Sequence, residues 1–274
     1  MRAPATSAPH GRGIPLFSII TVVLNDRDGL EATRRSLLRQ TCRDFEWIIV
    51  DGGSADGTAA AIRSFGDEVA WWRSAADRGP YDAMNNGMAA AKGEYLLFLN
   101  ADDTLVSCGS LAWLKGEILA GATPDGPLDF VYCATLERSA GGGLRIKPAR
   151  SHRMVWYGMF THHQAMIYRR AVVAGLAYDL SFTVGADYAF TIEALGRSAR
   201  VARGKQPLAV FAPAGLSGRL DRVGRLDQTR IRRKFLSLPV VFCFLIIQVQ
   251  SMTMLVRRRW PVIYEICRCW RMYG

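Results

Sequence analysis

The 274-residue sequence lacks the signature motifs of several large enzyme classes. No GxGxxG follows the first apolar run, so there is no dinucleotide fingerprint, and the absence of GxxxxGK(S/T) excludes a P-loop. The absence of GxSxG disfavours a hydrolase nucleophile elbow. Residues 1–13 contain no apolar segment that would indicate a secretory signal, and their Pro, Ala and Gly content predicts a frayed tail.

Cysteine and histidine do not show the spacing of a structural zinc site. No CxxC pair occurs among the six cysteines, which fits reduced thiols in a cytoplasmic enzyme. The adjacent His162 and His163 suit neither the spacing of helical metal ligands nor a shared strand face. The cysteines are Cys42, Cys108, Cys133, Cys243, Cys267 and Cys269.

Positive charge is unevenly distributed along the chain. The formal net charge is +11, and residues 219–274 carry 12 Lys and Arg against 3 Asp and Glu, whereas the other residues carry 23 and 21. A nucleic-acid-binding face more usually interleaves basic with polar residues, but here the basic residues alternate with long apolar runs. We therefore expect no nucleic-acid partner.

Four short apolar runs predict strands that are buried on both faces, with helical spacing between them. Four β–α repeats of this kind imply an α/β fold with a doubly wound, mostly parallel sheet. The predicted strands are 16–23, 45–50, 68–72 and 95–99; the predicted helices are 29–40, a short one capped by Asp56 or Thr58 and ending near 65, and 81–92.

The second half of the chain is less regular. Its patterns predict further strands around a glycine-rich hairpin tip, and one apolar helix. The strands are 128–136, 144–147, 164–168 and 200–211, the tip is 141–143, and the helix is 188–195.

Polar residues follow each of the four strands of the first half. Asn25 follows the first strand, residues 51–54 the second, 77–79 the third and 102–103 the fourth. In doubly wound sheets, ligands bind outside the carboxyl ends of the strands. Four polar loops on that one edge predict a ligand site there.

Two of these loops contribute carboxylates. Asp51, followed by two glycines, can accept hydrogen bonds from a base or ribose, although Asp-Gly is also common in simple tight turns. Asp102 and Asp103 offer oxygen ligands suited to Mg²⁺ or Mn²⁺ together with phosphates. Their alternative is a turn that caps the next helix, but the three neighbouring loops favour a metal site.

The start of the third helix offers a place for an anion. Asp77, Arg78 and Gly79 precede this helix, and its free N–H groups and dipole favour negative charge. Asp82 alternatively serves only to complement the dipole. Asn85 is a poor helix former, so helix propensity alone does not explain its presence.

The run FSIITVVLN…SLLRQT…DFEWIIVDGGSADGT…DRGPYDAMNNGMAAAKGEYLLFLNADD resembles family 2 glycosyltransferases of the GT-A fold. Downstream, HQA at 163–165, YRR at 168–170 and ADY at 186–188 are similar to segments of the colanic-acid and mycobacterial phenolic-glycolipid branch. The resemblance covers about residues 15–217, and six motif elements fall in the family's order.

The resemblance implies roles for individual residues. Asp187 would be the general base, although the sequence alone favours it as a helix N-cap. Asn100, Asp102 and Asp103 replace the family's DxD-type metal site; an amide at Asn100 supplies oxygen but no charge, so we place the metal chiefly on Asp102 with Asp103. His163 and Gln164 would contact the acceptor or diphosphate, and buried hydrogen bonding is the alternative for His163. The implied nucleotide-sugar-binding residues are Thr21, Asn25, Asp51, Gly52, Ser54, Asp77, Arg78, Gly79, Asp82, Asn85, Asn100, Ala101 and Asp102.

The resemblance also implies a domain plan and a reaction. Residues 14–218 would form the catalytic domain, divided into a nucleotide-sugar-binding half (14–105) and an acceptor half (106–218). The reaction would be an inverting, metal-dependent hexosyl transfer from a nucleotide-diphosphate-sugar to a hydroxyl of a lipid-linked or glycolipid acceptor. Such a transfer belongs to the biosynthesis of cell-surface polysaccharide or glycolipid.

Residues 219–274 predict a helical tail that attaches to an anionic membrane surface. The 22 uncharged residues from Phe235 to Val256 permit a span, but basic clusters flank both ends and Pro239 interrupts the run. Beyond it, aromatic residues recur opposite arginines, as in interfacial helices. We favour in-plane or re-entrant attachment at the inner face of the plasma membrane over a span or a helix packed on the enzyme or a partner, and leave a homo-oligomer open.

Two other functions fit parts of the sequence. A catalytically degenerate nucleotide-binding protein would keep the strand-end loops without a working metal site. A scaffold that binds membranes or RNA through residues 219–274 would need only the tail.

Overall fold

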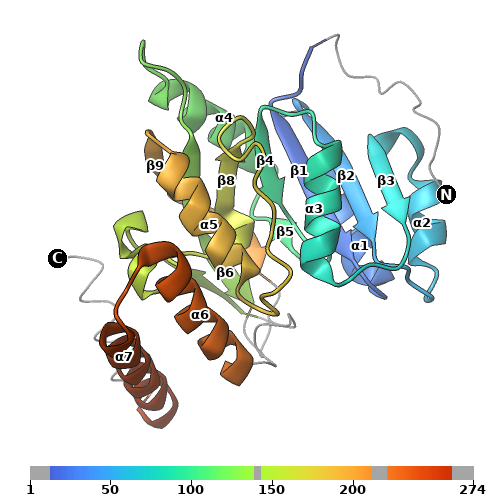
Figure 1. Cartoon of the computed structure of the whole chain (residues 1–274). Coiled ribbons are helices and arrows are strands. Elements are labelled where there is room, and N and C mark those ends of the chain that lie inside the picture. The colour runs from blue at the N-terminus through green and yellow to red at the C-terminus, as the bar shows by residue number, and fades with distance from the viewer. Residues whose placement is uncertain (1–12, 139–142, 212–220, 261–274) are drawn as a thin grey trace.

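The computed structural model describes residues 13–138, 143–211 and 221–260, and these form a mixed sheet between two layers of helices (Figure 1). Residues 1–12 of the predicted tail, most of the hairpin tip and residues 261–274 lie outside the described residues. The strands are β1 (Phe17–Val23), β2 (Phe45–Asp51), β3 (Trp71–Ser74), β4 (Tyr95–Phe98), β5 (Thr104–Leu105), β6 (Phe130–Arg138), β7 (Leu144–Lys147), β8 (Met166–Arg169) and β9 (Val201–Phe211). The helices are α1 (Arg27–Leu38), α2 (Thr58–Ser64), α3 (Pro80–Ala90), α4 (Ser110–Gly121), α5 (Ala186–Arg197), α6 (Asp221–Leu236) and α7 (Val240–Arg259), with 3-10 helices η1 (Gly66–Glu68), η2 (His152–Tyr157) and η3 (His163–Ala165).

The first half of the sheet is parallel, which confirms the predicted α/β fold. The strand order is β3-β2-β1-β4-β8-β6-β9-β5, with β7 beside β6, and the first four strands of this order run parallel. The register pairs Val23 with Asp51 and Asp51 with Ser74. The carboxyl ends of β1, β2 and β3 therefore lie side by side, and the loops that follow them share one edge.

The second half joins the same sheet through antiparallel pairs. Strand β8 pairs antiparallel with both β4 and β6, and β9 then pairs parallel with β6. This mixed pairing needs no helix between each pair of strands, since antiparallel neighbours are joined without a crossover. It explains why the second half shows no simple β–α repeat.

The apolar runs are continuous because both faces of the sheet are covered. In β1, Ile20 and Val22 belong to the core under α3 and α5, whereas Ile19 and Val23 belong to the core under α1, α2 and α4. Successive side chains of a strand point to opposite faces, so a strand between two helix layers needs apolar residues at every position.

Strand β3 and helix α4 show the clearest differences from the sequence prediction. The third strand begins at Trp71, not Glu68, because Glu68 ends η1 and its carboxylate accepts two hydrogen bonds from Arg34, at 2.5 and 2.6 Å. Helix α4 was not predicted. Apolar residues occur on its exposed side as well, such as Leu119 at 60% exposure, so its sequence shows no helical periodicity.

The uncharged run 235–256 is divided between two helices. Helix α6 ends at Leu236, Ser237 adopts a left-handed φ of 52°, and α7 begins after Pro239. No helix in the described part of the chain combines the length and the apolar character that crossing a bilayer requires.

Helix α6 packs directly on the segment before α5. The Asp227 carboxylate accepts a hydrogen bond from the Val184 N–H at 3.0 Å, and a Cβ on Gly185 would lie 2.8 Å from the Ile231 side chain. The fully buried Arg232 donates to the carbonyls of Trp156 and Tyr157 at the end of η2. The first tail helix is thus part of the folded body.

Replacing Thr21 by Val should destabilise the protein by about 1–3 kcal/mol, because two buried groups would lose their hydrogen-bond partner. The Thr21 hydroxyl is fully buried, donates to the Leu99 carbonyl at 2.7 Å and accepts from the Trp47 indole at 2.9 Å. Chemical denaturation measures the change, with Thr253→Val on the exposed side of α7 as the control. Equal stability of the two variants would contradict this role for Thr21.

Candidate functional site

Asp51 occupies the centre of the edge formed by the parallel strands. It is the last residue of β2 and fully buried, and its carboxylate accepts hydrogen bonds from the Ser54 N–H at 3.1 Å and the Ser74 hydroxyl at 2.6 Å. The Ser54 hydroxyl also donates to it. Asp51 is therefore held in one orientation by Ser54 of the following loop and by Ser74 at the end of β3. The role of Ser74 was not predicted from the sequence.

Asn25 joins the loop after β1 to the loop after β2. Its N–H donates to the Ser54 hydroxyl at 2.7 Å, and its side-chain oxygen accepts from the Ala55 N–H at 2.8 Å. Asn25 has a left-handed φ of 51°, which asparagine tolerates better than most residues. Both loops are exposed to solvent here, so the edge is accessible to a ligand.

Asp77 brings the third loop against the second. A Cβ on Gly52 would lie 3.0 Å from an oxygen of the Asp77 carboxylate, so only glycine permits this approach without a shift. The same carboxylate accepts from the Gly79 N–H at 2.8 Å. Gly79 has a φ of 111° and immediately precedes α3.

The polar residues of α3 divide into an exposed and an internal group. Arg78 and Asp82 form an ion pair at 3.2 Å, and the Arg78 side chain is 76% exposed at the mouth of the edge. Asn85 instead pairs with both backbone groups of Tyr178, at 3.0 and 2.8 Å. Its amide therefore connects α3 to the second half of the chain.

The loop after β4 contains the predicted metal ligands. Asn100 has a buried side-chain oxygen without a hydrogen-bond partner among the described residues. Asp102 is partly exposed and has a left-handed φ of 69°, and such strained backbone is concentrated at functional sites. Asp103 is 3% exposed and accepts from the Gln164 amide at 2.8 Å.

These residues fit a divalent cation that keeps part of its shell for other ligands. The Asn100 amide oxygen and the Asp102 carboxylate are hard oxygen donors, which suit Mg²⁺ or Mn²⁺. The described residues hold no cluster of three or more His, Cys, Asp or Glu side chains for a metal. A cation here would take its remaining ligands from phosphates and water.

Asp187 lies in the first turn of α5 and does not cap it. The residue that precedes the helix is Gly185, and the Asp187 carboxylate accepts from its neighbour's N–H, that of Tyr188, at 2.8 Å. The Tyr81 hydroxyl lies 3.3 Å from the same carboxylate oxygen. Burial raises the pKa of Asp187 to about 6, against the opposing effect of the hydrogen bonds from Tyr188 and Tyr81.

Tyr81 connects this carboxylate to the edge formed by the parallel strands. It is the second residue of α3, directly after the loop of Asp77 and Gly79, and its hydroxyl also donates to the Val184 carbonyl. Burial raises the pKa of Tyr81, so the phenol remains a donor at neutral pH. In the sequence, the position of Tyr81 in the PYD segment is the one feature that indicated a role near the predicted site.

His163 and Gln164 point into the protein. His163 is 7% exposed, lies 2.7 Å from the Tyr178 hydroxyl and stacks on Phe98 at 4.8 Å between ring centroids. Burial lowers the pKa of His163 to about 4, so the imidazole is neutral at pH 7. The Gln164 amide donates to the Asp103 carboxylate. His163 forms the buried hydrogen bond that the sequence analysis gave as its alternative role.

Known proteins resemble this chain in sequence and in fold. Residues 18–107 match the model of Glycosyl transferase family 2. A PGL/p-HBAD biosynthesis glycosyltransferase of Mycobacterium bovis is 33% identical over 258 residues, which cover 91% of this chain and 92% of that protein.

Solved structures share the fold at low sequence identity. A mannosyltransferase of Pyrobaculum calidifontis, in complex with GDP-Man and Mn²⁺, has a TM-score of 0.63 at 16% identity and covers 97% of this chain and 82% of its own. Residues 1–349 of S. aureus TarS, in complex with UDP-GlcNAc, have a TM-score of 0.62 at 18% identity and cover 84% and 70%. The chain therefore belongs to glycosyl transferase family 2 and has the GT-A fold of nucleotide-sugar-dependent glycosyltransferases.

Proposed function

We propose that the protein is an inverting, metal-dependent hexosyltransferase that moves a sugar from a nucleotide-diphosphate-sugar to a hydroxyl of a lipid-linked or glycolipid acceptor. The acceptor class is supported by the mycobacterial relative, whose name assigns it to PGL/p-HBAD biosynthesis. Attachment to the inner face of the plasma membrane through residues 219–274 is supported by the basic and apolar character of the tail.

One observation carries the assignment of the base. The Asp187 carboxylate has a raised pKa and lies 3.3 Å from the Tyr81 hydroxyl, at the end of α3 that adjoins the donor edge. A carboxylate whose pKa approaches neutrality is a stronger base than an exposed one and remains ionised at pH 7. Perturbed carboxylates of this kind are concentrated at catalytic sites.

The donor would lie along the edge formed by the loops after β1, β2 and β3. Asp51, held by Ser54 and Ser74, retains acceptor capacity for the base or ribose. The N-terminal end of the α3 dipole and the exposed Arg78 favour the diphosphate. Thr21 and Asn85 would contribute indirectly. Thr21 would hold neighbouring strands in place and Asn85 would hold α3 in place through buried hydrogen bonds.

Asp102, with the Asn100 amide and Asp103 beside it, would hold the cation. A bound Mg²⁺ or Mn²⁺ supplies Lewis-acid chemistry that offsets charge on the departing diphosphate. Asp102 remains partly exposed, whereas Gln164 orients Asp103 from within. Asp103 would thus hold the loop after β4 in position and add negative charge beside the cation.

Transfer would proceed by a single displacement. Asp187 accepts the proton of the acceptor hydroxyl as its oxygen forms a bond to the anomeric carbon. The bond from that carbon to the diphosphate oxygen breaks, and the electron pair leaves with the nucleoside diphosphate. Attack from the face opposite the leaving group inverts the anomeric configuration.

Asp187→Asn should lower transfer by about 10²–10⁴-fold, because an amide cannot accept the proton. Donor affinity should stay close to that of the wild type. In the wild-type enzyme, kcat/KM should fall below pH 6 as the carboxylate with a pKa of about 6 becomes protonated. Transfer assays across pH, with donor binding measured by calorimetry, test both statements, and unchanged transfer in the variant would remove Asp187 from the mechanism.

The same substitution should stabilise the folded protein above pH 6. The raised pKa means that the ionised carboxylate costs stability; this cost is absent below the unfolded-state pKa near 3.8, grows as pH rises towards 6 and is complete above it. Asp187→Asn should therefore raise the free energy of unfolding by about 2–3 kcal/mol at pH 7.5 and little at pH 4.

Asp179→Asn is the matched control for this measurement. Hydrogen bonds from Ser181 and the Lys234 ammonium lower the pKa of Asp179 to about 2, so its ionised form stabilises the fold at neutral pH. The control should lower the melting temperature at pH 7.5. A loss of stability in both variants would contradict the sign assigned to Asp187.

Asp102→Ala should weaken Mn²⁺ binding and reduce metal-stimulated transfer by at least about 100-fold, since a bound cation contributes several kcal/mol to the transition state. Mn²⁺ binding is measured by electron paramagnetic resonance without donor or acceptor. Asp125→Ala, on the exposed turn after α4, is the control. Metal-independent turnover that is insensitive to Asp102→Ala would refute the metal assignment.

A further inference from the structure

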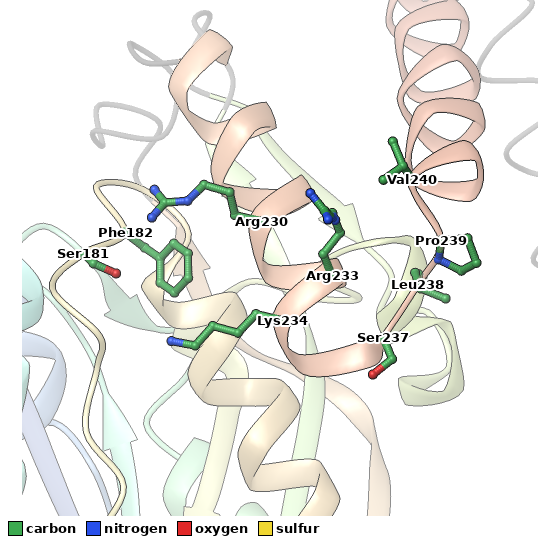
Figure 2. Close-up of a pocket in the computed structure, with 9 residues that line it drawn as sticks. All are labelled: Ser181, Phe182, Arg230, Arg233, Lys234, Ser237, Leu238, Pro239 and Val240. Atoms are coloured by element: carbon green, nitrogen blue, oxygen red, sulfur yellow. The ribbon is translucent and has the colours of Figure 1, made fainter.

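A pocket of about 600 Å³ lies away from the strand edge, where the loop before α5 meets the end of α6 and the start of α7 (Figure 2). Phe182 contributes one wall, Arg230, Arg233 and Lys234 of α6 contribute another, and Ser237 and Val240 belong to the turn into α7. The catalytic body and the tail thus form the pocket together.

The aromatic ring of Phe182 lies between two of the cations, as Figure 2 shows. The Arg230 guanidinium is 5.3 Å and the Lys234 ammonium 5.6 Å from the centre of this ring. Cation–π contacts of this length hold long basic side chains in place. Both cations are therefore directed towards the pocket while they remain largely exposed.

The pocket has an excess of positive charge. Asp227 lies 3.7 Å from Arg230 and Asp179 lies 3.0 Å from Lys234, so each of these cations has one acidic neighbour. Arg233 is exposed and forms no ion pair within the described ranges of the chain. Its guanidinium is available for a bidentate contact with a phosphate.

Helix α7 continues from the pocket as an apolar surface. Cys243 and Ile246 are buried against the body, whereas Val241, Phe242 and Met252 are 67%, 59% and 60% exposed. No Asp or Glu occurs between residues 237 and 259. Apolar surface of this extent on a soluble domain marks an interaction site.

We propose that this pocket binds the phosphate of an anionic phospholipid headgroup while α7 lies in the adjoining apolar boundary of the bilayer. The inference rests on the membrane attachment within the proposed function and assigns it a defined binding site. The arrangement favours a lipid, because a cationic pocket adjoins a helix that exposes aliphatic and aromatic side chains. A second copy of the chain is a poorer occupant. It would bring basic residues of the two pockets together, and α7 has no acidic residues to offset this repulsion.

Vesicle binding of the full-length protein tests the proposal. Wild type should bind vesicles of phosphatidylglycerol and phosphatidylcholine more tightly than vesicles of phosphatidylcholine alone. Arg233→Gln should weaken binding to the anionic vesicles by about 30-fold, through loss of charge-assisted hydrogen bonds to phosphate. Arg259→Gln, an exposed arginine at the far end of α7, should cost only about 5-fold, the effect of one surface charge. Arg63→Gln on α2 should have no effect.

Three outcomes would overturn the pocket. The first is an equal loss of vesicle affinity in Arg233→Gln and Arg259→Gln. The second is equal binding of the wild type to anionic and neutral vesicles. The third is thermal stabilisation by inorganic phosphate that depends on Arg233, without any preference for anionic vesicles. Donor binding and hydrolysis are measured on the same proteins and should be unchanged in Arg233→Gln. Failure of the wild type to bind a nucleotide-sugar would count against the proposed transfer. The vesicle measurements would still test whether the pocket binds a lipid headgroup.

Discussion

The hydrogen bonds between α3 and residues 178–187 hold the two halves of the site in register. Asn85 pairs with both backbone groups of Tyr178, and the Tyr81 hydroxyl donates to the Val184 carbonyl beside Asp187. Helix α3 starts at the edge formed by the parallel strands, so any shift of this helix would move the strand-end loops and the candidate base together. Buried amide and phenol groups of this kind are costly to leave unpaired, which keeps the arrangement rigid.

The first tail helix supports the same segment from the other side. Asp227 accepts from the Val184 N–H, and Gly185 lies against Ile231 where a larger residue would clash. Arg232 fixes α6 to the end of η2 through two carbonyl groups. The segment before Asp187 is therefore held between α3 and α6. The tail contributes to the shape of the candidate active site as well as to the surface that we assign to lipid.

The sequence predicted most strands close to their observed bounds, and it placed the start of β3 too early. β1, β2 and β4 begin within about one residue of their predicted positions because they are buried at every position and are mostly apolar. β3 is only partly buried, so its true range from Trp71 was hidden, and with it the partnership of Ser74 and Asp51. Helix α4 has apolar residues on its exposed side as well as its buried side, which weakened its amphipathic pattern, and it was not predicted.

The sequence by itself determined that polar loops meet at one edge of a parallel sheet, because strands that alternate with helices run parallel and their carboxyl ends share one edge. Tertiary structure alone decided what each polar side chain does there. The polar groups of Asn85 and Thr21 form buried hydrogen bonds within the protein. Ser74 orients Asp51 through a hydrogen bond. Burial beside Tyr81 raises the pKa of Asp187. These roles depend on contacts between residues far apart in the chain, and desolvation and hydrogen-bond partners cannot be assigned until such contacts form.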